Sequence, residues 1–325
     1  RGTEVSLFEQ EFAEKIGAKH CISTSSGTDA LLALLMAMDI EPGSDVIVPS
    51  FTFVASASTI SRAGYNPIFV DIEKNSFVSS LRLIKEAWTK NTKAVIFVHL
   101  FGEPTNLTEL YSFCKKKGAY LIEDCAQSYG SNVGVSSDAS AFSFFPAKNL
   151  GCLGDGGAII TNNDELATNV RKVTVHGAQK KYHYELMGGN FRLDTIQASF
   201  LRILLRNSDE WIEKRRDNAD FYNQILTDIP DLQLPTNTAG HAWNQYTLTT
   251  SRRDSLYKHL KDSGTGCAVY YPIPLHHSKI FNSNAVLPET DKRCSEVLSI
   301  PIYPGLTESE RLMVVNQIRS FFKCE

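Results

Sequence analysis

The sequence has little excess charge and only short apolar runs. It contains 33 Lys and Arg against 36 Asp and Glu in 325 residues, a formal net charge of −3. This near balance gives no electrostatic reason to expect binding to nucleic acid or to an anionic membrane surface. The longest apolar stretch, residues 30–38, is far too short to span a bilayer. We therefore expect a cytoplasmic protein with neither nucleic acid nor membrane among its partners.

The sequence also lacks a disulfide framework and a cysteine-based metal motif. The cysteines number seven, an odd count, and the nearest two, Cys114 and Cys125, are too far apart for a CxxC pair. His276 and His277 are adjacent, but no carboxylate or cysteine stands near them in the sequence. Because a metal site needs further ligands, the sequence predicts no metal site.

Strand and helix patterns alternate through the first half of the chain. Hydrophobic residues make up 42% and charged residues 21%, which excludes disorder and provides for a large core. Short apolar segments rich in β-branched and aromatic residues predict seven strands, at 19–23, 45–48, 68–70, 94–99, 120–122, 141–145 and 158–161. Helical spacing between several of them, as at 31–38, predicts an α/β fold with a mostly parallel seven-stranded sheet.

The second half of the chain has a different pattern. A long helix is expected over 193–227, shorter pieces rich in proline follow, and a last helix is expected over 308–322. The length alone suggests about two domains. We expect a large domain at 1–205 and a smaller C-terminal α+β domain at 206–325, joined by the long helix.

Three predicted strands are followed by residues that suit a ligand, and ligands of open α/β sheets bind at the carboxyl ends of strands. Residues 24–30 read Thr-Ser-Ser-Gly-Thr-Asp-Ala at a helix start, which suits a phosphate but also an ordinary helix cap. Asp124 follows another strand, where it could pair with a cationic ring nitrogen or cap a helix. Lys148 follows a third, as an imine-forming amine or as a solvated side chain.

Together the three signals match the needs of pyridoxal 5'-phosphate. The cradle at 24–30 would anchor the phosphate, and Lys148 would hold the aldehyde. Asp124 would keep the pyridine nitrogen protonated, so that the ring accepts electrons.

Longer motifs carry a family resemblance. They cover residues 25–31, 48–55, 123–127, 142–151, 189–194, 271–276 and 299–304. These segments resemble the sugar aminotransferases of the DegT/DnrJ/EryC1/StrS family, and the resemblance extends over essentially the whole chain. It implies the aspartate-aminotransferase fold, fold type I.

The resemblance also implies roles for single residues. Lys148 matches the Schiff-base lysine and Asp124 the acid paired with the pyridine nitrogen, and these two are the expected catalytic residues. The other implied cofactor contacts are Gln127 near the ring hydroxyl, Phe53 stacked on the ring, Gly27, Thr28 and Ser143 on the phosphate, and Asn190 reaching the phosphate from the neighbouring subunit of a homodimer.

Two departures from the family pattern are expected to be gaps in the sequence. The family usually has about 30–40 further residues before the position of Arg1, a segment of the kind that is frayed at chain ends. The stretch around Asn132 and Val133 is a few residues shorter than the usual hairpin.

The loop before Asn190 is the expected substrate contact. Lys180 and Lys181 would face the diphosphate of a sugar nucleotide, and Tyr182 and His183 the sugar or the base. The alternative is a solvated basic loop. The composition of this loop resembles family members that aminate carbon 3 of the sugar, which slightly favours carbon 3 over carbon 4.

The resulting hypothesis is a pyridoxal-phosphate-dependent aminotransferase. It would take an amino group from an amino acid, L-glutamate, and pass it through pyridoxamine 5'-phosphate to a nucleotide-diphosphate keto-hexose for amino-sugar biosynthesis. Cyclitol aminotransferases share the same motifs and are the main alternative. A sugar dehydratase of the family would carry histidine in place of Lys148, and a non-catalytic paralogue would not need Lys148, Asp124 and Gln127 together.

Overall fold

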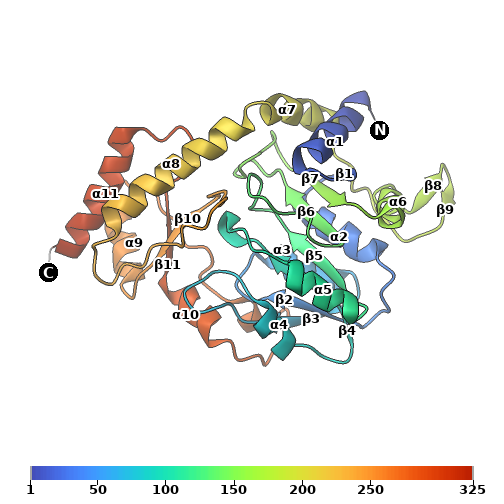
Figure 1. Cartoon of the computed structure of the whole chain (residues 1–325), viewed down its shortest axis with the longest axis horizontal. Helices are drawn as coiled ribbons and strands as arrows, with labels where there is room; N and C mark the ends of the chain where they lie inside the picture. The colour runs from blue at the N-terminus through green and yellow to red at the C-terminus, as the bar shows by residue number, and fades with distance from the viewer. Residues whose placement is uncertain (1, 324–325) are drawn as a thin grey trace.

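A seven-stranded sheet forms the centre of the protein in the computed structural model, which describes residues 2–323 (Figure 1). Its order is β1-β7-β6-β5-β4-β2-β3. The strands are β1 (His20–Thr24), β2 (Asp45–Pro49), β3 (Asn66–Val70), β4 (Thr92–Val98), β5 (Tyr120–Asp124), β6 (Ala139–Ser143) and β7 (Gly157–Thr161). The seven predicted strands are all present. The sheet is parallel except for β7, which runs antiparallel to both of its neighbours, β1 and β6.

Helices cover the sheet. Those of the first half are α1 (Thr3–Ile16), α2 (Gly27–Ala37), α3 (Val54–Arg62), α4 (Leu81–Glu86), α5 (Thr108–Lys116) and α6 (Asp164–Val173), with the short 3-10 turn η1 (Leu100–Gly102) after β4. Helix α2 packs against β6, β7, α3 and α6, and it is apolar almost all round because it is buried on nearly every side.

The long helix predicted over 193–227 is two helices. Helix α7 (Thr195–Leu205) ends before Arg206, and α8 (Ser208–Leu226) begins after Asn207. The Asp194 carboxylate caps α7 by accepting a hydrogen bond from the Ile196 N–H at 3.1 Å. The pair nevertheless joins the sheet to the C-terminal part of the chain, and α8 crosses the upper side of the molecule in Figure 1.

The C-terminal part has a core of its own. Strands β10 (Tyr246–Thr249) and β11 (Val297–Ile300) pair antiparallel, and α8, α9 (Arg253–Asp262) and α11 (Glu308–Lys323) lie with them. Tyr222, Tyr246 and Ile318 are among the fully buried side chains of this core. The predicted last helix is confirmed as α11.

Part of the C-terminal sequence packs against the large hydrophobic core formed by the sheet and its helices. The turn η2 (Leu275–His277) and helix α10 (Pro288–Glu296) place Leu275, Leu287 and Cys294 against the residues of the sheet. We propose that the two cores mark domains at 1–205 and 206–325, with this returning segment packed on the larger one. Within residues 2–323, no helix is both long enough and apolar enough to cross a membrane.

Candidate active site

A cavity of about 500 Å³ lies beside the ends of β5 and β6. Seven of the predicted site residues line it, which are Gly27, Thr28, Phe53, Asp124, Gln127, Ser143 and Lys148. These residues come from segments up to about a third of the chain apart, and the fold brings their side chains to one cavity.

The N terminus of α2 forms one end of the cavity. Ser26 caps the helix, since its Oγ accepts a hydrogen bond from the Asp29 N–H at 3.0 Å. The first N–H groups of a helix have no partner within the helix, and the dipole adds positive potential there. Gly27 is needed for packing, because a Cβ at this position would lie 2.7 Å from the Cβ of Ser143. Gly27, Thr28 and Ser143 thus make a cradle for an anionic group.

Asp124 is the last residue of β5 and is buried. Its Oδ2 accepts a hydrogen bond from Ser56 Oγ at 2.7 Å, and its Oδ1 accepts one from the Ala126 N–H at 3.1 Å. Burial raises the pKa of Asp124, while the Ser56 and Ala126 donors and the charge of Lys148 act in the opposite direction. A cationic ring nitrogen beside this carboxylate would stabilise its charged form.

Lys148 lies in the turn after β6. Its own N–H donates to the Phe145 carbonyl at 2.8 Å, and the next residue, Asn149, donates through its side-chain amide to the carbonyls of Tyr129 and Ala242 at 3.1 and 2.8 Å. Burial lowers the pKa of Lys148, and the charge of Asp124 offsets part of this effect. A neutral amine is the nucleophilic form, so burial favours attack on a carbonyl.

Gln127 and Tyr271 form another wall of the cavity. Gln127 Oε1 accepts a hydrogen bond from the Phe101 N–H at 2.7 Å, and its Nε2 donates to the Tyr271 hydroxyl at 3.3 Å. The rings of Tyr271 and Phe53 have centroids 6.1 Å apart. The motif at 271–276 is visible in the sequence, but the role of Tyr271 is not, because its partners Gln127 and Phe53 lie in the other half of the chain.

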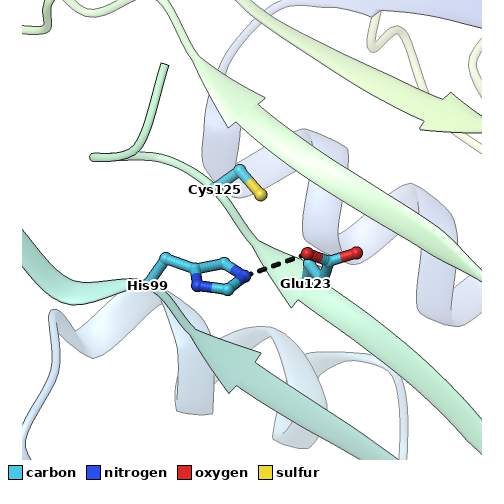
Figure 2. A group of neighbouring side chains, drawn as sticks. All are labelled: His99, Glu123 and Cys125. Carbon is cyan, nitrogen blue, oxygen red and sulfur yellow. Dashed lines mark hydrogen bonds and ion pairs between the residues drawn. The ribbon is translucent and has the colours of Figure 1, made fainter. Parts of the chain in front are cut away.

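His99, Glu123 and Cys125 lie together in the protein interior (Figure 2). His99 Nε2 lies 2.9 Å from Glu123 Oε2, and the Glu123 carboxylate also accepts the N–H groups of Gly134 and Ser136. Burial acts to raise the pKa of Glu123, but the hydrogen bond and charge of His99 and the Gly134 donor outweigh it, so the pKa is lowered. None of the three lines the cavity. They hold the end of β5 in place.

Asn190 and the four predicted substrate contacts do not line the cavity. Lys180, Lys181, Tyr182 and His183 lie exposed on the hairpin of β8 (Ala178–Lys180) and β9 (His183–Tyr184), and none lines the cavity of its own chain. The hairpin projects from the edge of the molecule in Figure 1. Asn190 is exposed too, and its Oδ1 accepts a hydrogen bond from Arg192 Nε at 2.8 Å.

The residues of the cavity fit pyridoxal phosphate. An anion cradle, a buried carboxylate and a lysine with a lowered pKa surround a space with an aromatic wall. A mostly parallel sheet with this site at the strand ends defines the class as a fold type I enzyme of pyridoxal-phosphate chemistry. Within that class, the sequence profile of the DegT/DnrJ/EryC1/StrS aminotransferase family matches residues 1–319. The chain belongs to this family, as its motifs predicted.

The chain is similar to known proteins over nearly its whole length. The chain is 40% identical to a "Pleiotropic regulatory protein" of Geobacillus stearothermophilus, over 99% of this chain and 90% of that protein. It is 38% identical to the UDP-N-acetyl-3-dehydro-alpha-D-glucosamine 3-aminotransferase of Acidithiobacillus ferrooxidans, over 98% and 88% of the two chains. The solved structure of NtdA from Bacillus subtilis with bound cofactor PMP superposes with a TM-score of 0.95 at 30% identity, covering 99% of this chain and 78% of NtdA. The cofactor prediction is therefore confirmed at the level of the family.

Proposed function

We propose that the protein transfers an amino group from L-glutamate to carbon 3 of a nucleotide-diphosphate keto-hexose, with pyridoxal phosphate bound in the cavity. The main support for this proposal is that Lys148 and Asp124 line one cavity, next to the anion cradle at the start of α2. If Lys148 were only a solvated surface lysine and Asp124 only a helix cap, nothing would require both side chains to line the same cavity. Membership of an aminotransferase family supports the same reaction.

The bound cofactor supplies an electron-accepting ring that stabilises negative charge on the donor carbon. Lys148, which its turn holds in the cavity and whose pKa is lowered by burial, would move the proton between that carbon and the cofactor through its Nζ. Asp124, fixed by Ser56 and Ala126, would hold the ring nitrogen in its cationic form. Phe53 and Tyr271, whose rings lie 6.1 Å apart in the cavity wall, would flank the ring and restrict water.

The sugar acceptor is proposed from the relatives and the loop at 180–183. The Acidithiobacillus ferrooxidans relative bears the name of a 3-aminotransferase acting on a UDP-linked 3-keto sugar. Lys180 and Lys181 provide the positive charge that a diphosphate requires, in a chain whose overall charge is slightly negative. Carbon 3 is therefore preferred over carbon 4.

We propose a homodimer in which each cavity is completed by the partner. Asn190 and the hairpin residues lie outside the cavity of their own chain, so they contact substrate or phosphate only across an interface. The same hairpin region exposes Tyr182, Tyr184 and Met187, whose side chains are 73%, 64% and 84% exposed. Exposed apolar groups of this kind are typical of an interface.

One experiment separates the acceptors. The protein is first converted to its pyridoxamine phosphate form with L-glutamate and freed of keto acid. It is then mixed with 3-keto and 4-keto nucleotide sugars and with a keto-inositol, and the return of the pyridoxal phosphate absorbance is followed. The proposal expects the fastest return with a 3-keto nucleotide sugar. Return with the keto-inositol alone would establish the cyclitol alternative, and no return with any acceptor after a normal glutamate step would contradict the proposed acceptor class.

A further inference from the structure

The turn η2 and the helix α10 bring two imidazoles and a carboxylate together away from the cavity. Asp291 Oδ1 lies 3.4 Å from Nε2 of His276 and 3.5 Å from Nε2 of His277. All three ligand atoms lie within 4.8 Å of one another. None of these residues lines the cavity of the proposed active site. The sequence offered no carboxylate near the histidines, and the fold supplies Asp291 from the next helix.

Two of the three atoms are buried without a hydrogen-bond partner. The side chain of His276 is 1% exposed. Within residues 2–323, neither its Nε2 nor Asp291 Oδ1 makes a hydrogen bond. Leaving a buried polar atom without a hydrogen bond costs about 1–3 kcal/mol in general. These two atoms face each other only as an ion pair at 3.4 Å, so a ligand bound between them and His277 Nε2 would satisfy both.

The neighbouring groups already have other partners. His276 Nδ1 lies 2.8 Å from Ser50 Oγ, a contact of the kind that fixes the ring of a metal-binding histidine. The N terminus of α10 is capped by Asp71, whose carboxylate accepts the N–H groups of Glu289 and Thr290 at 3.1 and 2.8 Å. Asp291 is therefore not needed as a helix cap.

The spacing matches a tetrahedral zinc ion. With zinc–ligand bonds of about 2.0–2.1 Å, two ligands of a tetrahedron lie about 3.3–3.4 Å apart. The two nitrogen–oxygen distances are 3.4 and 3.5 Å. The side chains of His277 and Asp291 are 55% and 41% exposed, so water can reach a fourth position on an ion bound there.

The cluster of His99, Glu123 and Cys125 offers no comparable site, because Glu123 already accepts three hydrogen bonds and burial raises the pKa of the Cys125 thiol.

We propose that His276, His277 and Asp291 bind one Zn²⁺, with water as the fourth ligand. The ion ties the turn η2 to the helix α10, and it stabilises the segment that begins a few residues after Tyr271, the residue in the cavity wall. Its role is structural, since it lies outside the cavity.

The test uses the holoenzyme without an affinity tag, stripped of metal by a chelator and dialysed against Zn²⁺. We expect one Zn²⁺ per chain by elemental analysis and a higher melting temperature with zinc. Co²⁺ in place of Zn²⁺ should give the intense visible absorption of a four-coordinate ion. His277→Ala and Asp291→Asn should each weaken zinc binding at least tenfold, and Ser50→Ala about tenfold through the orientation of His276.

His20→Ala is the matched control. His20 Nε2 also lies against a carboxylate, that of Asp164, at 2.6 Å, but it has no second imidazole there. Because His277 is half-exposed, its variant should fold, and circular dichroism checks this. Zinc binding that survives in folded His277→Ala and Asp291→Asn proteins, or no zinc on the wild type, would overturn the proposal.

Discussion

Gly27 and Ser143 approach so closely that a Cβ on Gly27 would lie 2.7 Å from the Cβ of Ser143 and 3.2 Å from its Cα. This contact joins the start of α2 to the end of β6, the two elements of the anion cradle. Lys148 comes five residues after Ser143, so the position of the lysine depends on the same strand end as the anion cradle.

Gly27→Ala tests this contact. The added methyl group should separate α2 from β6, lower the free energy of unfolding by about 1–3 kcal/mol and weaken cofactor binding about tenfold or more. Gly266→Ala is the control, since its added Cβ would meet no atom closer than 4.0 Å. Absorbance titration with pyridoxal phosphate measures the affinity of both variants. An equal affinity in Gly27→Ala and Gly266→Ala would remove the argument for the cradle.

Ser56→Ala tests the environment of Asp124. Ser56 donates to the charged carboxylate at 2.7 Å, and a hydrogen bond to the charged form lowers a carboxyl pKa. Its removal should raise the pKa of Asp124 further, because the charged carboxylate loses a donor that stabilises it. Carbon-13 NMR titration of the cofactor-free protein measures this directly. Ser58→Ala, on the same helix but outside the cavity, should leave that pKa unchanged.

The elements were more predictable than their junctions. All seven strands followed from runs of β-branched and aromatic residues, because strands buried on both faces have this composition. The break between α7 and α8 was not predicted, although Asn207 and Ser208, followed by Asp209 and Glu210, are typical of a helix boundary. The antiparallel direction of β7 also depends on how the chain returns, which periodicity does not encode.

The residues of the site were also predicted only in part. Gly27, Asp124 and Lys148 lie at or a few residues after the carboxyl ends of strands, so the rule for strand ends predicted them. Tyr271 was not found, because its partner Gln127 lies far away in the sequence. Asp291 was not found, because the turn and helix that bring it to His276 and His277 form only on folding. Asn190 was assigned to a partner subunit by resemblance alone, and its exposed position within one chain leaves that assignment as a prediction.

Subunit mixing tests the shared site. Lys148→Ala and Asn190→Asp proteins should each be inactive as homodimers. In a hybrid dimer one cavity keeps both native groups if Asn190 acts on the partner, so random exchange should restore roughly a quarter of the sites. Native mass spectrometry verifies the exchange and a coupled assay measures the activity. An absence of recovery in proven hybrids would mean that Asn190 serves its own chain or no site.

Replacing both Lys180 and Lys181 with alanine tests the diphosphate contact. The KM for the nucleotide sugar should rise about tenfold, equivalent to ~1.4 kcal/mol, while the glutamate half-reaction stays nearly unchanged. The difference between wild type and variant should shrink at high salt, because exposed charges are screened. Stopped-flow measurement of each half-reaction separates the two effects. Equal damage to both halves would place the loop at the cofactor rather than at the sugar.

The most direct test of the central claim is to find where the cofactor is attached. The purified protein, loaded with pyridoxal phosphate, is reduced with borohydride, digested and mapped by mass spectrometry. Because Lys148 is the lysine that lines the cavity with Asp124, the reduced cofactor should be found on Lys148, and Lys148→Ala should carry no adduct and lose turnover by orders of magnitude. An adduct on any other lysine, or turnover retained in Lys148→Ala, would contradict the account.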